Sequence, residues 1–371
     1  MIPYLFVWVI TYIFAIWDAY ELDQRLFKIG YVILFLVLTI FVGTRFETGP
    51  DIFNYEAFFS QVPPLNVLLK NFSDYSYIPL EPAYKIVSGT FRYLGFTFNG
   101  FLLVFSASFV ALVFKMIPKY SSMAYFSVML YLYYGYFTGF SAIRQVLAAA
   151  IFFVAIYYVY NKNLYKYLAT LVVATMFHLS AIVIVPMYWL SKVRWSKMQY
   201  FLVLICVFGI RLSGIISSFT GYIFGVLNFS NYQLMNDKVQ MYADAEGGYL
   251  GTMVLEWLFL LIVFIVKYDE LDESNKYFKI IFNFFFFGFI YYSFFSAIGD
   301  FGRIVVYFKL IYLIIIPMLV NLYEDKKAKF LLINLFSVLV LIRIIISVNA
   351  DTTNAQVNHN RYLPYKSWLI Q

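Results

Sequence analysis

The sequence predicts an all-helical, polytopic integral membrane protein with about 10 to 12 transmembrane helices in a single transmembrane domain, residues 1–371. Hydrophobic residues make up 63% of the chain and charged residues only 13%, which excludes a soluble globular core. Residues 121–143 and 145–161 carry no charge, and each run is close to the roughly 20 residues that a helix needs to cross the hydrocarbon layer. Lipid offers the backbone no hydrogen-bond partners, so we expect such runs to cross as helices.

Apolar runs follow one another along most of the chain. The first run lacks the basic flank and small-residue cleavage site of a secretory signal and leads directly into a second apolar run, so we expect a retained helix. Apolar spans are expected near residues 3–17, 29–44, 98–114, 122–137, 142–160, 199–213, 251–266, 278–297, 303–321 and 329–348.

One apolar stretch, residues 167–190, is interrupted by His178 and Ser180. It forms either one long span or two half-length helices that meet at a polar tip. We expect the hairpin, because the loops richest in Lys and Arg then share one face, which the positive-inside rule assigns to the cytoplasm. A crossing by residues 82–98 would keep the same bias, but two basic residues in that segment favour a helix that lies in the membrane interface.

This topology brings the unusual polar segments to the outer face. They are the loops near 45–97 and 214–250, the turns at 139–145 and 299–303, and the tip at His178. We find no internal repeat and no paired broken helices, the features of an alternating-access transporter. The single Cys206 excludes an internal disulfide and a Cys-based metal site. The net charge of +7 is dispersed over loop ends, so nucleic acid is not expected as a partner.

The loop after the second span combines an Arg, a tight turn and a carboxylate. Gly49 and Pro50 predict a turn that brings Arg45 back towards Asp51 at the membrane surface. Tyr55 follows, and an aromatic ring beside carboxylates suits a sugar site, because flat apolar faces stack on pyranose rings while charged acceptors bind hydroxyls. The alternative is an interfacial aromatic belt with Arg45 and Asp51 as a surface ion pair.

Two further segments add polar groups at the same face. Glu81 and Tyr84 open the segment after the loop. Arg144 and Gln145 stand at the outer start of a helix whose next turn, 148–150, is all Ala and permits close helix contact. The planar fork of Arg suits a phosphate or diphosphate. The alternative is an Arg that snorkels to the outer headgroups.

His178 is one of two histidines and lies in an otherwise apolar stretch. A neutral imidazole near pH 7 could orient or deprotonate a sugar hydroxyl, and the alternative is a hydrogen-bonded packing residue. Asp300 and Arg303 flank an outer turn, where they either contact substrate or pair with each other. The remaining intramembrane charges receive no role from the sequence: Arg211, Glu256, Lys309 and Arg343.

The order of these short motifs resembles the EpsG family of bacterial exopolysaccharide proteins, within the Wzy-type polysaccharide polymerases. The resemblance extends over roughly residues 1–330, and Pro50 departs from the small or hydroxyl residue expected before the Asp. The matching motifs are Arg45, Gly49-Pro50-Asp51 with Tyr55, Glu81-Pro82-Ala83-Tyr84, Ile143-Arg144-Gln145-Val146-Leu147-Ala148, Phe177-His178-Leu179-Ser180-Ala181 and Gly302-Arg303.

The resemblance implies a glycosyltransferase at the outer face of the bacterial cytoplasmic (inner) membrane. It would join oligosaccharide repeat units carried on undecaprenyl diphosphate into O-antigen, capsule or exopolysaccharide, together with a flippase and a chain-length regulator of the same pathway. No cofactor and no metal are expected, because Arg side chains can stabilise the departing lipid diphosphate, although the acidic pair at 244–246 keeps a metal possible.

Residue roles follow from this mechanism. Arg144 and Arg303 would clamp the diphosphate with help from Arg45, and one of Asp51, Glu81 and His178 would activate the acceptor hydroxyl. The sugars would be positioned by Tyr55, Tyr84 and Gln145, with Asp300 as a further contact.

Three alternatives remain open at this stage. A transporter or flippase would move lipid-linked oligosaccharide without chemistry, and it would carry charged residues along a path through both leaflets. A ligase or another lipid-linked sugar transferase would use the same groups on a different acceptor. A structural subunit of an export complex would use none of them.

Overall fold

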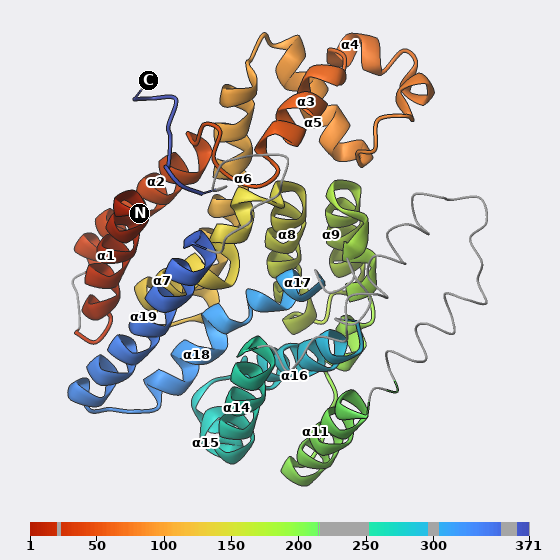
Figure 1. The fold of residues 1–371 in the computed structure, drawn as a ribbon. Helices are drawn as coiled ribbons and strands as arrows, with labels where there is room; N and C mark the ends of the chain where they lie inside the picture. Colours follow the sequence, from red (N-terminus) through yellow and green to blue (C-terminus); the bar gives the residue numbers. More distant parts are fainter. Residues whose placement is uncertain (21–23, 214, 216–251, 296–303, 350–361, 371) are drawn as a thin grey trace.

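The computed structural model describes residues 1–20, 24–213, 215, 252–295, 304–349 and 362–370 (Figure 1). Within these ranges the chain is helical, and the β pairing consists of one isolated bridge between Arg45 and Ser367. The helices are α1 (Ile2–Trp17), α2 (Gln24–Gly43), α3 (Ile52–Gln61), α4 (Leu65–Leu68), α5 (Pro82–Tyr93), α6 (Phe98–Tyr120), α7 (Ala124–Tyr131), α8 (Ile143–Tyr160), α9 (Leu164–Phe177), α10 (Met187–Leu190), α11 (Lys197–Leu212), α14 (Thr252–Val266), α15 (Tyr268–Ser274), α16 (Phe278–Phe295), α17 (Val305–Lys309), α18 (Tyr312–Asn321) and α19 (Lys326–Asn349).

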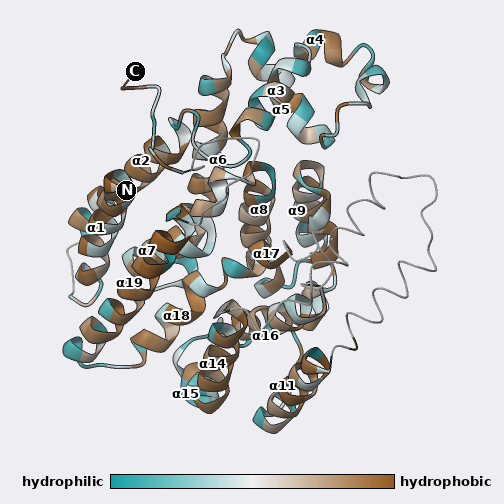
Figure 2. Ribbon diagram, viewed as in Figure 1, coloured by the Kyte–Doolittle hydropathy of each residue, from teal (hydrophilic) through white to brown (hydrophobic). Residues whose placement is uncertain are grey.

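The fold is that of a polytopic membrane protein. Among the described residues, α2, α6, α8 and α19 are long and apolar enough to cross a membrane, and further apolar helices are shorter. Apolar colour runs along the body of the bundle, whereas α3 to α5 carry more polar residues (Figure 2). The number of crossings and the side that faces the cytoplasm stay predictions.

In the described residues, each of the ten expected apolar stretches is mainly helical, and two of them are interrupted. The stretch 122–137 continues from α7 into a π-helical turn, η2 (Leu132–Tyr136), and a 3-10 turn, η3 (Phe137–Phe140). The stretch 303–321 is divided into α17 and α18. Hydropathy alone could not predict these interruptions, because the residues on both sides of each one are equally apolar.

The centre of the bundle is made by α7, α8 and α18. Every residue of α7 is buried, and 67% of the membrane-length window of α8 is buried, against 33% for α19 at the edge. α8 packs on α6, α9 and α17, so three neighbouring helices fix its position in the bundle.

The predicted hairpin around His178 is present. α9 ends at Phe177, His178 is extended, and a 3-10 helix, η4 (Leu179–Ile184), runs back along α9. The Tyr167 hydroxyl donates to the Ile184 carbonyl at 2.8 Å, which ties the two arms together. His178 consequently lies at the tip, at the same end of the bundle as α5.

The segment predicted to lie in the interface forms α5, whose twelve residues are too few to cross a bilayer. Its Lys85 is buried and donates to the Tyr75 carbonyl at 2.8 Å. Arg92, at the other end of α5, donates to the Val62 carbonyl at 2.6 Å just after the last turn of α3, where a cation is favoured. These bonds join α3 and α5 into one unit at the end of the bundle.

Residues 362–370 cross the loop that follows α2. Phe46 donates to the Lys366 carbonyl at 2.9 Å, and Trp368 donates to the Thr44 carbonyl at 3.1 Å. The Lys366 ammonium pairs with Glu47 at 2.6 Å. Hydrogen bonds and an ion pair thus hold the loop that begins at Arg45 against a segment more than 300 positions away in the sequence.

Candidate active site

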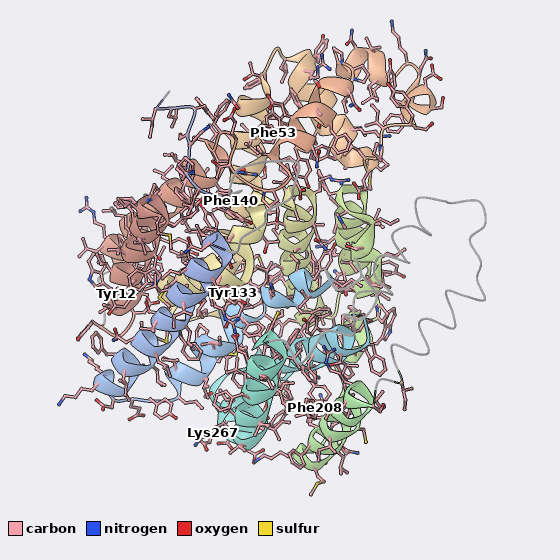
Figure 3. The ribbon with its side chains drawn as sticks, in the orientation of Figure 1. Tyr12, Phe53, Tyr133, Phe140, Phe208 and Lys267 are labelled. Atoms are coloured by element: carbon pink, nitrogen blue, oxygen red, sulfur yellow. The ribbon has the colours of Figure 1, made fainter. Side chains whose placement is uncertain are left out.

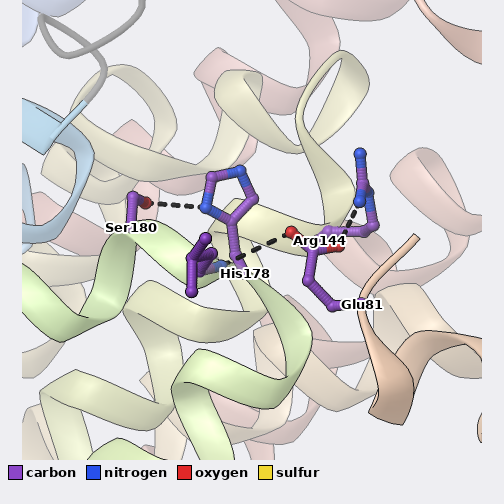
Figure 4. A network of polar contacts seen from close by, with 5 residues as sticks. Glu81, Arg144, His178 and Ser180 are labelled. Atoms are coloured by element: carbon purple, nitrogen blue, oxygen red, sulfur yellow. Dashed lines mark hydrogen bonds and ion pairs between the residues drawn. The ribbon is translucent and has the colours of Figure 1, made fainter. Parts of the chain in front are cut away.

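An ion pair between Arg144 and Glu81 lies where α5 and α8 both begin (Figure 4). Arg144 is the second residue of α8, and Glu81 is the N-cap residue of α5, with Pro82 fixing the first helical position. Glu81 makes no side-chain bond to its own helix, so its carboxylate is directed to its neighbours. Its second oxygen accepts a long hydrogen bond, 3.4 Å, from the Leu179 backbone N–H.

The pair is half-buried, because the side chains of Arg144 and Glu81 are 19% and 18% exposed. It can therefore be reached by a ligand, while its surroundings strengthen charge interactions relative to water. The N-termini of α5 and α8 converge here, and Ala142, the N-cap of α8, has no side chain to accept from the first-turn N–H groups. Helix N-termini favour anions, so this place suits a phosphate group.

Two tyrosines flank the guanidinium of Arg144. Its central carbon lies 6.0 Å from the ring centre of Tyr55 and 5.8 Å from that of Tyr84, and the two ring centres are 6.2 Å apart. Burial raises the pKa of both phenols above its ordinary value of 10, so both stay protonated near neutral pH. Among the described residues, neither the Tyr84 hydroxyl nor the Arg144 Nε has a hydrogen-bond partner. Both atoms are buried, so they are unsatisfied polar groups inside the protein.

A second line of contacts leads away from the pair through the hairpin tip. His178 Nδ1 lies 2.6 Å from the Ser180 hydroxyl, which lies 2.9 Å from the hydroxyl of Tyr307 on α17. The Leu179 backbone connects this line to Glu81 (Figure 4). Sequence reasoning singled out His178 and Ser180 but gave Tyr307 no role, because one Tyr among 35 carries no signal.

Arg45 lies inside the protein. Its side chain is fully buried, and its guanidinium donates to the Gly139 carbonyl at 3.0 Å and to the Val42 carbonyl, with its central carbon 5.1 Å from the Phe140 ring centre. The alternative of a surface ion pair with Asp51 is therefore wrong. Burial lowers the pKa of Arg45 to about 10, so it stays charged at neutral pH. A direct contact with substrate would require it to leave these carbonyls.

The predicted turn at Gly49 is present and fits closely against the chain that precedes α8. Gly49 has φ +116°, and a Cβ there would lie 2.3 Å from the Phe140 carbonyl oxygen. Only glycine permits both this conformation and this approach. The turn leads to Asp51, the N-cap residue of α3, so that Tyr55 on the first turn of α3 reaches Arg144.

The remaining predicted residues divide into two groups. Gln145 is buried beside Arg144, with 2% of its surface exposed. Asp300, Arg303, the loop 214–250 and the acidic pair at 244–246 lie outside the described residues. Within the described ranges, no group of three His, Cys, Asp or Glu side chains could hold a metal ion.

Comparison with protein families decides the identification. The model of the EpsG family matches residues 28–367, nearly the whole chain. The chain belongs to the EpsG family. This is a family of polysaccharide polymerases, which makes the protein a member with glycosyltransferase-like polymerase activity. No curated protein and no solved structure gives a significant match. In this EpsG family member, Arg144, Glu81, His178 and their tyrosine neighbours form one contact group at one end of the bundle.

Proposed function

We propose that this protein polymerises oligosaccharide repeat units carried on undecaprenyl diphosphate into a surface polysaccharide, at the outer face of the bacterial cytoplasmic membrane. Membership of a polysaccharide polymerase family gives the class of activity. The observation that supports the chemistry is the half-buried Arg144–Glu81 pair beside two tyrosine rings.

Arg144 acts on the leaving group in this proposal. The anomeric carbon of the growing chain loses its bond to the lipid diphosphate, and negative charge develops on the departing oxygen. A diphosphate that displaces Glu81 from Arg144 gains a charge-assisted hydrogen bond in a site that is shielded from water. Two helix N-termini add their partial positive charge. Tyr55 and Tyr84 are buried beside the guanidinium and position it for the diphosphate.

Glu81 acts on the acceptor. Once released from Arg144, its carboxylate takes the proton of the acceptor hydroxyl while that oxygen forms the new bond to the anomeric carbon. The proton thus moves to Glu81 and the electron pair of the broken bond leaves with the lipid diphosphate. His178 and Asp51 remain the other two candidate bases, and the contact between Glu81 and Arg144 favours Glu81.

The test is turnover with purified protein in nanodiscs and lipid-linked repeat units, with products separated on a gel. Wild type should give a ladder of polymer with or without a chelator, and Arg144→Ala should give none while keeping its thermal unfolding temperature within a few degrees. Normal chain length in Arg144→Ala would overturn the role of Arg144. Intact units that cross sealed vesicles without a ladder would instead establish a transporter, and transfer to a different acceptor would establish a ligase.

A further inference from the structure

A second group of ionisable side chains lies inside the helix bundle, apart from the Arg144–Glu81 pair. Glu256 on α14 accepts a hydrogen bond from the Tyr134 hydroxyl and pairs with Arg343 on α19 at 3.3 Å. Lys309, at the end of α17, is the third charged member. Each lies in an apolar stretch, where a charged side chain costs roughly 2.5–3.5 kcal/mol on insertion scales and is usually retained for a function.

Two neighbouring tyrosines organise this group. The Tyr133 ring centre lies 5.5 Å from the guanidinium carbon of Arg343 and 5.8 Å from the ammonium of Lys309, so two cations share one ring. Tyr134 stacks on Tyr312 at 4.2 Å between ring centres while it bonds Glu256. Both tyrosines belong to the π-helical turn η2, and Figure 3 labels Tyr133 in the interior beside α19. Single π turns of this kind are frequent at functional sites.

The group has more positive than negative charge. Glu256 is paired with Arg343, and among the described residues no acid lies within ion-pair distance of the Lys309 ammonium. The side chains of Arg343 and Glu256 are 23% and 21% exposed, so an outside molecule can reach them. An Arg fork and an ammonium over an aromatic ring suit a phosphate or diphosphate. In a membrane, such groups are carried by lipids.

One short helix connects the two sites. α17 has five residues and carries both Tyr307, which contacts Ser180, and Lys309, which contacts Tyr133. Residues two positions apart on a helix are rotated by about 200°, so these side chains leave α17 on opposite faces. The contacts of His178, Ser180 and Tyr307 thus lie on one side of α17, and the group that contains Lys309 lies on the other.

We propose that Lys309 and Arg343 bind the diphosphate of a second lipid-linked substrate, the acceptor. This inference rests on the proposed polymerase function, which needs two lipid carriers at once. The diphosphate at Arg144 is the leaving group and adjoins the reacting carbon. The diphosphate of the acceptor is one repeat unit away from the reacting hydroxyl, so it needs its own site at a distance from Glu81, and the far side of α17 provides one.

The experiment counts bound lipids by native mass spectrometry of the detergent-solubilised protein with sugar-free undecaprenyl diphosphate. Wild type should hold two molecules, and Lys309→Met should hold one at the same lipid concentration. This variant leaves the Arg343–Glu256 pair intact, so it should fold. Lys119→Met is the matched control, because Lys119 also lies over a tyrosine ring, that of Tyr157 at 4.7 Å, and it should hold two.

Two lipids bound to Lys309→Met would overturn the second site. Displacement of the second lipid by phosphatidylglycerol at equal concentration would also overturn it, because the site would then serve any anionic lipid headgroup. The outcome is separate from that of the polymerase test. A wild type that holds two lipids but makes no polymer would disprove the polymerase and keep the site, whereas polymer synthesis with an unchanged lipid count in Lys309→Met would do the reverse.

Discussion

Two Arg–Glu pairs in this protein use the same residue types in different settings. Arg144–Glu81 joins the starts of two helices at the end of the bundle, and its carboxylate is linked through Leu179 to His178, Ser180 and Tyr307. Arg343–Glu256 joins two helices in the bundle and has a further cation, Lys309, beside it. In our proposals the first setting moves a proton and the second holds a diphosphate. The side chains around an Arg–Glu ion pair therefore determine its function more than the two paired residues do.

Exchanging the Arg and the Glu within each pair should give the largest difference in turnover between the two pairs. The double variant Arg144→Glu with Glu81→Arg keeps an ion pair but moves the cation, so turnover should fall by roughly 10³-fold, as when a positioned donor to a developing anion is lost. The same exchange of Arg343 and Glu256 should cost less than about tenfold in kcat, because in our proposal that pair lies away from the reacting carbon and its loss should raise mainly the KM for the acceptor. Polymer assays on both double variants check this, and equal losses would contradict the comparison.

Removing only the proposed base gives the next largest effect. Glu81→Gln keeps the shape of the side chain and removes the proton acceptor, so kcat should fall by at least roughly 10²-fold. Initial rates of the purified variant measure this loss. If His178→Gln, rather than Glu81→Gln, removed the activity, the base would be His178.

Removing the surplus cation should affect binding more than chemistry. Lys309→Met should raise the KM for the lipid-linked acceptor by roughly tenfold, with a smaller change in kcat, because it removes an interaction that is the same in the ground state and the transition state. Steady-state rates at varied acceptor concentration measure this split. A fall in kcat at unchanged KM would place Lys309 with the reacting atoms instead.

The smallest expected effect is at Tyr307 on α17, the helix that lies between the two sites. Tyr307→Phe removes the hydroxyl that contacts Ser180 and leaves the buried ring in place. A net hydrogen bond of roughly 1 kcal/mol corresponds to about a fivefold change, so kcat should fall by about that factor. Ser180→Ala also removes the contact with His178, so its loss should be larger. The double variant should lose little more than Ser180→Ala, since both changes remove the contact between Ser180 and Tyr307.

The helices could be predicted from the sequence far better than the contacts could. Long apolar runs determine where helices form in lipid, and the described part of each of the ten expected stretches is mainly helical. The convergence of Glu81, Arg144 and His178 was also predicted, because loop charge bias assigned them to one face. Their pairing was not, since Glu81 and Arg144 are 63 positions apart and helix packing alone brings them together.

One wrong interpretation and one unassigned group have physical causes. Arg45 was expected at the surface because it follows an apolar run, yet the Gly139 carbonyl, 94 positions away, and the Val42 carbonyl accept from its guanidinium in the interior. The Glu256, Lys309 and Arg343 group had no visible relation in the sequence, because its members lie on three helices and the tyrosines that join them belong to a fourth segment. Local spacing carries no information about such contacts.

Residues 362–370 have a consequence for the order in which the protein is assembled. A ribosome releases the Arg45 loop early, but the backbone partners of Phe46 and Thr44 emerge only after α19 has been made. These hydrogen bonds therefore stay unmade through most of translation. A nascent chain stopped before residue 362 should contain every helix that the structure describes and still leave the loop beside Arg45 accessible to a protease, which the chain that includes residues 362–370 would resist.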